Sequence, residues 1–149
     1  MTTIKPVHRD LVEAIAARNL IKARELNEAM PPEEHQAYSQ YLSAVFSLLL
    51  DDFFGTGLSR DSIAGFANQL REDYRDSGVP FNRLAVEGVI RASAGETSLF
   101  EDLTSEDIVS TQVMVIGKLG TQGTAVRPDL DRFLDEAEVM VAEWEQEDQ

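Results

Sequence analysis

The sequence predicts an all-α fold, a single-domain helical bundle of five to seven helices around a buried central helix at about residues 35–54. Three observations favour this fold. Apolar residues recur at the three- and four-residue spacing of amphipathic helices through most of the chain. Prolines, glycines and N-cap residues mark where helices begin and end. The 149 residues, 43% hydrophobic and 27% charged, fit one folded domain of ordinary size.

The segment 35–54 is predicted to be the helix around which the others pack. Its apolar residues cover more than the third of the circumference that a surface helix buries. Such a helix is covered either by its neighbours or by a second copy of the chain, and we therefore predict a homodimer. The apolar stripe comprises Tyr38, Tyr41, Leu42, Val45, Leu49 and Phe53, and its flank comprises Phe46, Leu50 and Phe54.

Residues 1–30 are predicted to form an N-terminal helical pair. Pro6 suits the first turn of one helix, which runs to about Asn19, and a second helix runs from Leu20 to Met30. Two prolines then end the second helix. The single domain 1–149 is therefore expected to comprise this pair, core helices within 33–119 and a closing amphipathic helix at 128–146.

The core helices after the central one have clear boundaries. Ser59 and Thr104 are predicted N-caps, and a helix between them runs from about Asn82 to Ala94. Residues 113–116 are rich in β-branched side chains, which favour strands, but the cap at Thr104 and the apolar spacing favour a helix to Leu119. The apolar residues of the 82–94 helix are Leu84, Val86, Val89 and Ile90.

The last part of the chain is predicted to be a polar loop followed by the closing helix. Residues 120–127 contain two glycines and are expected to form the most mobile loop. The closing helix has the most regular apolar stripe of the chain, running from Leu130 to Trp144, and acidic residues line its opposite side.

The net charge of −14 excludes some partners. Residues 129–149 hold nine acidic residues against Arg132 alone, a net charge of −8. Binding to nucleic acid is not expected, because neutralising phosphates needs clustered Lys and Arg. A basic protein surface is a compatible partner. No apolar run is long enough to cross a membrane, and we predict no membrane partner. Without a signal-peptide pattern, a cytoplasmic location is expected.

The sequence contains few residues that could form a catalytic, cofactor or metal site. There are no cysteines and only two histidines, so no catalytic, cofactor or multi-histidine metal site is predicted, and no cofactor is expected. Asp51 and Asp52 are weak candidates for a hard metal ion. Consecutive helical residues point about 100° apart, which disfavours convergence on one ligand. Carboxylates are unfavourable at the C-terminal end of a helix, so either the helix ends early or a basic side chain such as Arg60 lies close.

The predicted function is a non-enzymatic protein-interaction or regulatory domain. Asp131, Asp135 and Glu138 on the closing helix are the candidate partner-binding residues. The alternative is a module that encloses a small apolar ligand between its helices. A small enzyme of unknown chemistry is the third hypothesis. The residues predicted to line a ligand pocket or a dimer core are Tyr38, Tyr41, Phe46, Phe53, Phe54 and Phe66.

Overall fold

The protein is all-α, which confirms the predicted fold class. The structure is a computed structural model that describes residues 4–76, 81–122 and 125–147. The α-helices are α1 (Pro6–Ala16), α2 (Leu20–Ala29), α3 (His35–Phe54), α4 (Arg60–Asp73), α5 (Arg83–Ser93), α6 (Ser105–Leu119) and α7 (Leu130–Glu147). Two 3₁₀ segments, η1 (Pro32–Glu34) and η2 (Thr97–Asp102), precede α3 and α6.

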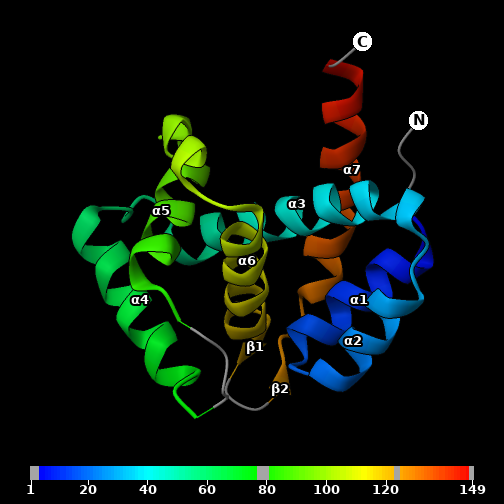
Figure 1. The fold of residues 1–149 in the computed structure, drawn as a ribbon, viewed down its shortest axis with the longest axis horizontal. Helices are drawn as coiled ribbons and strands as arrows, with labels where there is room; N and C mark the ends of the chain where they lie inside the picture. The colour runs from blue at the N-terminus through cyan, green and yellow to red at the C-terminus, as the bar shows by residue number, and fades with distance from the viewer. Residues whose placement is uncertain (1–3, 77–80, 123–124, 148–149) are drawn as a thin grey trace.

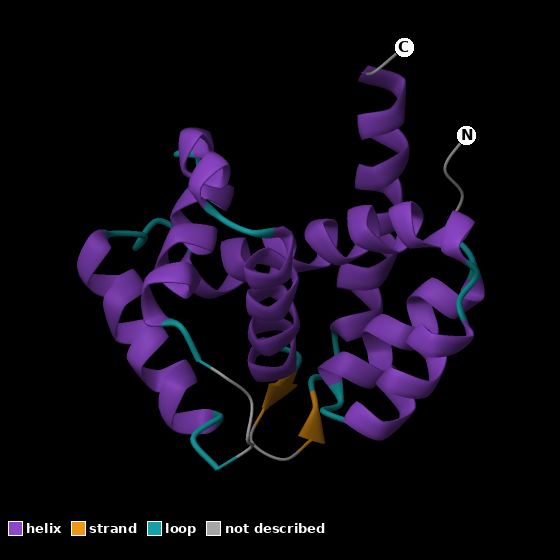
Figure 2. Ribbon diagram, viewed as in Figure 1, coloured by secondary structure: helices purple, strands orange, loops and turns teal. Residues whose placement is uncertain are grey.

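The helices are arranged around α3, which runs along the long axis of the molecule (Figure 1). The pair α1 and α2 lies at its N-terminal end, and α4 and α5 lie at its C-terminal end. Both α6 and α7 pack against α3, and α7 crosses it and extends beyond it. Figure 2 shows the two short strands, β1 (Thr121–Gln122) and β2 (Ala125–Val126), between α6 and α7.

One chain covers most of α3. Tyr41, Leu42, Val45 and Leu49 have no exposed surface, and Phe46 is 1% exposed. These side chains lie in one core with residues of α1, α4, α5, α6 and α7. Of the two ways to cover this helix, the structure shows coverage by its neighbours for most of the stripe. The apolar circumference of α3 is therefore no longer an argument for a homodimer, which stays a prediction.

The local cap signals locate the helix starts correctly. Ser59 and Thr104 cap α4 and α6 as predicted, each accepting a hydrogen bond from the backbone N–H three residues later. Asn19 and Asn82 cap α2 and α5 in the same way. Residues 113–116 are helical, because the tertiary packing of α6 overrides their β-branched character. Short polar side chains thus fix the boundaries locally.

The structure places one apolar residue of α5 outside the core and corrects one expectation about a loop. Leu84 is 78% exposed, because Val86, Val89 and Ile90 occupy the face of α5 toward the core and Leu84 lies on the opposite side. The segment expected to be only a loop contains the antiparallel pair β1 and β2, in which Thr121 pairs with Val126. The described part of this segment is thus paired backbone, and residues 123–124 lie outside the described residues.

His8 is a buried polar residue that the sequence did not reveal. Its side chain has no exposed surface. Its Nδ1 accepts a hydrogen bond from the backbone N–H of Lys5 at 2.8 Å, and its Nε2 lies 3.2 Å from the carbonyl oxygen of Glu34. One ring nitrogen accepts and the other donates, as in a neutral imidazole with its proton on Nε2. The ring therefore ties the start of α1 to η1.

Tyr41, which is buried, and Tyr38, which is partly buried, make the stability of the fold sensitive to high pH. The Tyr41 hydroxyl donates a hydrogen bond to the carbonyl oxygen of Leu134 on α7 at 3.1 Å. Burial raises the pKa of Tyr38 from 10.0 to about 12, and burial raises the pKa of Tyr41 as well. Above pH 10 the unfolded chain loses these protons first, so the folded state binds more protons and the free energy of unfolding falls as pH rises.

We therefore expect stability to be independent of these tyrosines below about pH 9 and to fall between about pH 10 and 12. Urea unfolding across this range, with absorbance of tyrosinate followed in parallel, measures both effects. The variant Tyr38→Phe should lose part of the pH dependence. An unchanged slope in this variant would contradict the assignment.

In the described ranges, no helix has both the length and the apolar character needed to cross a bilayer.

Candidate functional site

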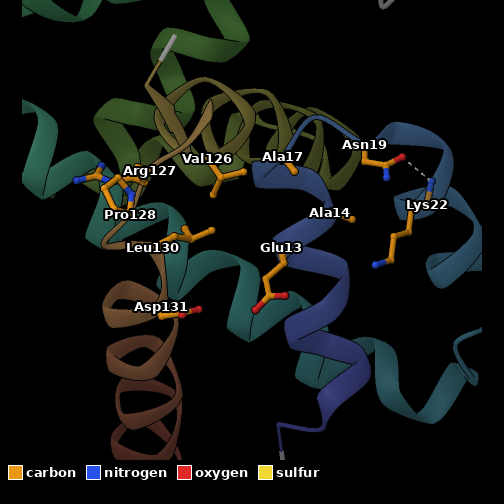
Figure 3. A pocket seen from close by; sticks show the side chains of 10 residues that line it. All are labelled: Glu13, Ala14, Ala17, Asn19, Lys22, Val126, Arg127, Pro128, Leu130 and Asp131. Carbon is orange, nitrogen blue, oxygen red and sulfur yellow. Dashed lines mark hydrogen bonds between the residues drawn. The ribbon is translucent and has the colours of Figure 1, made fainter. Parts of the chain in front are cut away.

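A groove of about 380 Å³ lies where α1 ends, α2 begins and the chain passes from β2 into α7 (Figure 3). Half of its lining residues are apolar, and we call these its floor: Ala14, Ala17, Val126, Pro128 and Leu130. The lining also includes charged side chains from three different helices. The volume falls in the range of ordinary ligand sites. The lining residues are Glu13, Ala14, Ala17, Asn19, Lys22, Val126, Arg127, Pro128, Leu130 and Asp131.

One wall of the groove is shaped by the turn from α1 to α2. Arg18 has a φ of 59°, in the left-handed region, and this ends α1 abruptly. Its Nε donates to the carbonyl oxygen of Gly117 on α6 at 2.9 Å, which holds the turn in place. Asn19 then caps α2 through the backbone N–H of Lys22 at 3.2 Å. The lysine side chain is consequently placed at the edge of the groove (Figure 3).

The opposite wall is fixed by Arg127, whose side chain is 12% exposed. Its Nε lies 2.7 Å from Oδ1 of Asp129, and its Nη2 lies 3.1 Å from Oδ2 of Asp52 at the end of α3. The guanidinium carbon also lies 4.6 Å from the centre of the Phe133 ring. Hydrogen bonding to Arg127 lowers the pKa of Asp129, so this carboxylate stays charged. Arg127 thus joins β2, the start of α7 and α3.

An acidic cluster borders the groove, and we define it as Glu13, Asp131, Asp135 and Glu138. All four carboxylates surround Arg9 on α1, and three of them come from one face of α7. Their distances to guanidinium nitrogens are 2.7 Å for Asp135, 3.2 Å for Asp131, 3.3 Å for Glu13 and 3.6 Å for Glu138. One arginine faces four carboxylates, so the acidic cluster and Arg9 together have a net charge of −3. Hydrogen bonding to Asp135 and Asp131 raises the pKa of Arg9.

The groove and the acidic cluster are continuous, because Glu13 and Asp131 belong to both. Asp131 is 82% exposed and Glu13 is 43% exposed, so both can meet a ligand from solution. The floor beside them consists of Ala14, Ala17 and other small or apolar side chains. This arrangement suits a cationic group next to an apolar one.

The structure brings together only some of the predicted site residues. Asp131, Asp135 and Glu138 lie side by side, as predicted. Their contact with Arg9 was not predicted. Sequence reasoning missed Arg9 and Glu13, because no local signal places α1 beside α7. Asp52 pairs with Arg127 rather than with the expected Arg60. Within the described ranges, no group of three or more histidine, aspartate or glutamate side chains is arranged so that it could hold a metal ion.

The aromatic residues proposed as a ligand pocket are mostly parts of the packed core. Tyr41 and Phe46 are buried, while Phe53 is 49% exposed. Phe53, Phe54 and Phe66 pack on one another, with ring centres 4.9 to 5.5 Å apart. Phe54 also lines a small hollow of about 100 Å³ beside Leu58 and Ile90. Neither this hollow nor the groove is lined by Tyr41 or Phe46.

Comparison of the chain with family models, with curated proteins and with solved structures finds no match.

Proposed function

We propose that this protein is a helical interaction module that binds a basic, partly apolar segment of another protein in the groove between α1 and α7. The observation that carries the proposal is the continuity of the apolar floor with the acidic cluster, whose net charge together with Arg9 is −3. A basic side chain of the partner would lie beside Asp131 and Glu13. An adjacent apolar side chain would lie on the floor of the groove.

The shape of the charged surface favours a protein segment over a small ligand. Asp135 and Glu138 do not line the groove, and they extend its acidic edge along α7. An occupant that contacts both the floor and these carboxylates is longer than the groove itself. The overall charge of −14 adds a long-range attraction for basic partners and raises their association rate.

The direct test measures binding of a capped peptide that combines arginine and leucine, with a second peptide in which glutamate replaces every arginine. We expect the basic peptide to bind and the acidic one to fail. The double variant Glu13→Gln/Asp131→Asn should weaken binding of the basic peptide about tenfold, because two charge pairs of roughly 0.5–1 kcal/mol each are lost. Asp135 and Glu138 still pair with Arg9, so the fold should remain intact.

A matched control separates the groove from general charge attraction. The double variant Glu101→Gln/Glu106→Gln removes the same net charge from two exposed residues that lie outside the groove and the acidic cluster. We expect it to change binding less than twofold. Ala17→Trp places a large side chain in an exposed part of the groove and should abolish binding of the basic peptide. Equal weakening by both double variants, or no effect of Ala17→Trp, would contradict the proposal.

A further inference from the structure

We infer that the segment bound in this groove is dipolar, with a cationic group at the α7 side and a carboxylate at the α2 side. The inference rests on the proposed function and specifies the chemistry of the partner. It comes from the distribution of charge across the groove. Figure 3 shows Lys22 entering from α2 on one side, Asp131 from α7 on the other and Glu13 between them.

Lys22 is the cation of the groove that is available to a ligand. Arg127 also lines the groove, but its guanidinium is already held by Asp129 and Asp52 and is only 12% exposed. The Lys22 side chain is exposed, and in the described part of the chain its ammonium has no ion pair or hydrogen bond. The cap contact of this residue uses its backbone N–H, so the side chain contributes nothing to the turn.

On the acidic side of the groove, the protein itself compensates only part of the negative charge. Asp131 shares Arg9 with three other carboxylates, so its negative charge is only partly compensated. An occupant carrying only basic groups would satisfy Asp131 but would place positive charge toward Lys22 as well. A carboxylate at the end of the occupant near Lys22 removes the repulsion from this lysine and adds an attraction to it. The groove therefore selects against uniformly basic segments, although the chain as a whole is strongly acidic.

The test uses three capped peptides of equal length that share an arginine and an apolar centre. Their far ends carry an aspartate, an asparagine or a lysine. We expect the wild-type protein to bind the aspartate peptide at least threefold more tightly than the asparagine peptide, and the lysine peptide most weakly. A fourth peptide, with asparagine and a free C-terminal carboxylate, tests whether a chain end can supply the anion.

Substitution of Lys22 should change this order. Lys22→Met should remove the preference for the aspartate peptide, and Lys22→Glu should reverse it in favour of the lysine peptide. Arg24→Met and Arg24→Glu are matched controls, because Arg24 is an exposed cation of the same helix that does not line the groove. These controls make the same change in net charge and should leave the order unchanged.

The binding results distinguish failure of the dipolar inference from failure of the proposed function. If the wild-type protein binds all four arginine peptides equally, or if the Lys22 and Arg24 variants behave alike, the dipolar inference is overturned while the proposed function stands. If none of the arginine peptides binds the wild-type protein, both fail. An order that follows the charge at position 22, and not the charge at position 24, supports the inference.

Discussion

Replacing Gly120 by alanine is expected to lower the free energy of unfolding by about 2–3 kcal/mol. Gly120 lies where the end of α6 approaches the last turn of α1. A Cβ added there would lie 2.6 Å from the Cβ of Ala16, 2.9 Å from its Cα and 2.7 Å from the carbonyl oxygen of Ile116. Two of these atoms belong to Ala16 on α1, so α1 and α6 must separate to relieve those contacts, and the oxygen of Ile116 belongs to the backbone of α6 itself. Urea unfolding followed by circular dichroism measures the change.

Gly65→Ala is the matched control for this substitution. Gly65 is an exposed residue inside α4, and an added Cβ would meet no atom within 4 Å. Alanine restricts the unfolded chain and favours the helix, so this variant should gain about 0.5–1 kcal/mol. If the two variants changed stability in the same direction by similar amounts, close packing at Gly120 would not be the cause. A smaller loss at Gly120 would indicate that α1 can shift without disturbing the core.

Leu134→Ala is expected to lower the free energy of unfolding by about 3 kcal/mol. The Leu134 side chain has no exposed surface and lies in the main core. Its backbone carbonyl accepts the Tyr41 hydroxyl, so this position joins α7 to α3 by both packing and a hydrogen bond. Alanine leaves a cavity that these rigid neighbours cannot fill. The melting temperature should fall by roughly 6–12 °C.

Val139→Ala tests whether the effect depends on burial and not on the helix itself. Val139 is on the same helix but is 57% exposed. Its truncation should change the free energy of unfolding by less than about 0.5 kcal/mol. Comparable losses at positions 134 and 139 would mean that α7 is stabilised by its own helical propensity more than by contact with α3.

The sequence predicted the helices well because their signals are local. The cap at Ser59 or Thr104 needs only a side-chain oxygen and a backbone N–H three residues later. The spacing of Leu130, Leu134 and Val141 likewise defined the buried face of α7 without knowledge of its neighbours. Leu84 shows the limit of this reasoning, because composition identified an apolar residue but not which face of α5 the core would take.

The sequence predicted the acidic residues of the candidate site but not the residues that pair with them. The acidic face formed by Asp131, Asp135 and Glu138 follows from helical spacing alone. Arg9 lies more than 120 positions earlier in the chain, and no local pattern connects it to that face. Asp52 and Arg127 are similarly distant in sequence, and their pairing depends on how α3 and β2 are placed.

The sequence by itself determined the all-α class, the helix boundaries and the excess of acidic charge, because each depends on residue type and short-range spacing. Only the tertiary structure decided that one chain covers α3 and that α1, α2, β2 and α7 enclose a groove. It also set Lys22 and Asp131 on opposite sides of that groove. Contacts between helices depend on how their surfaces pack in three dimensions, and the linear order of residues does not specify which surfaces meet.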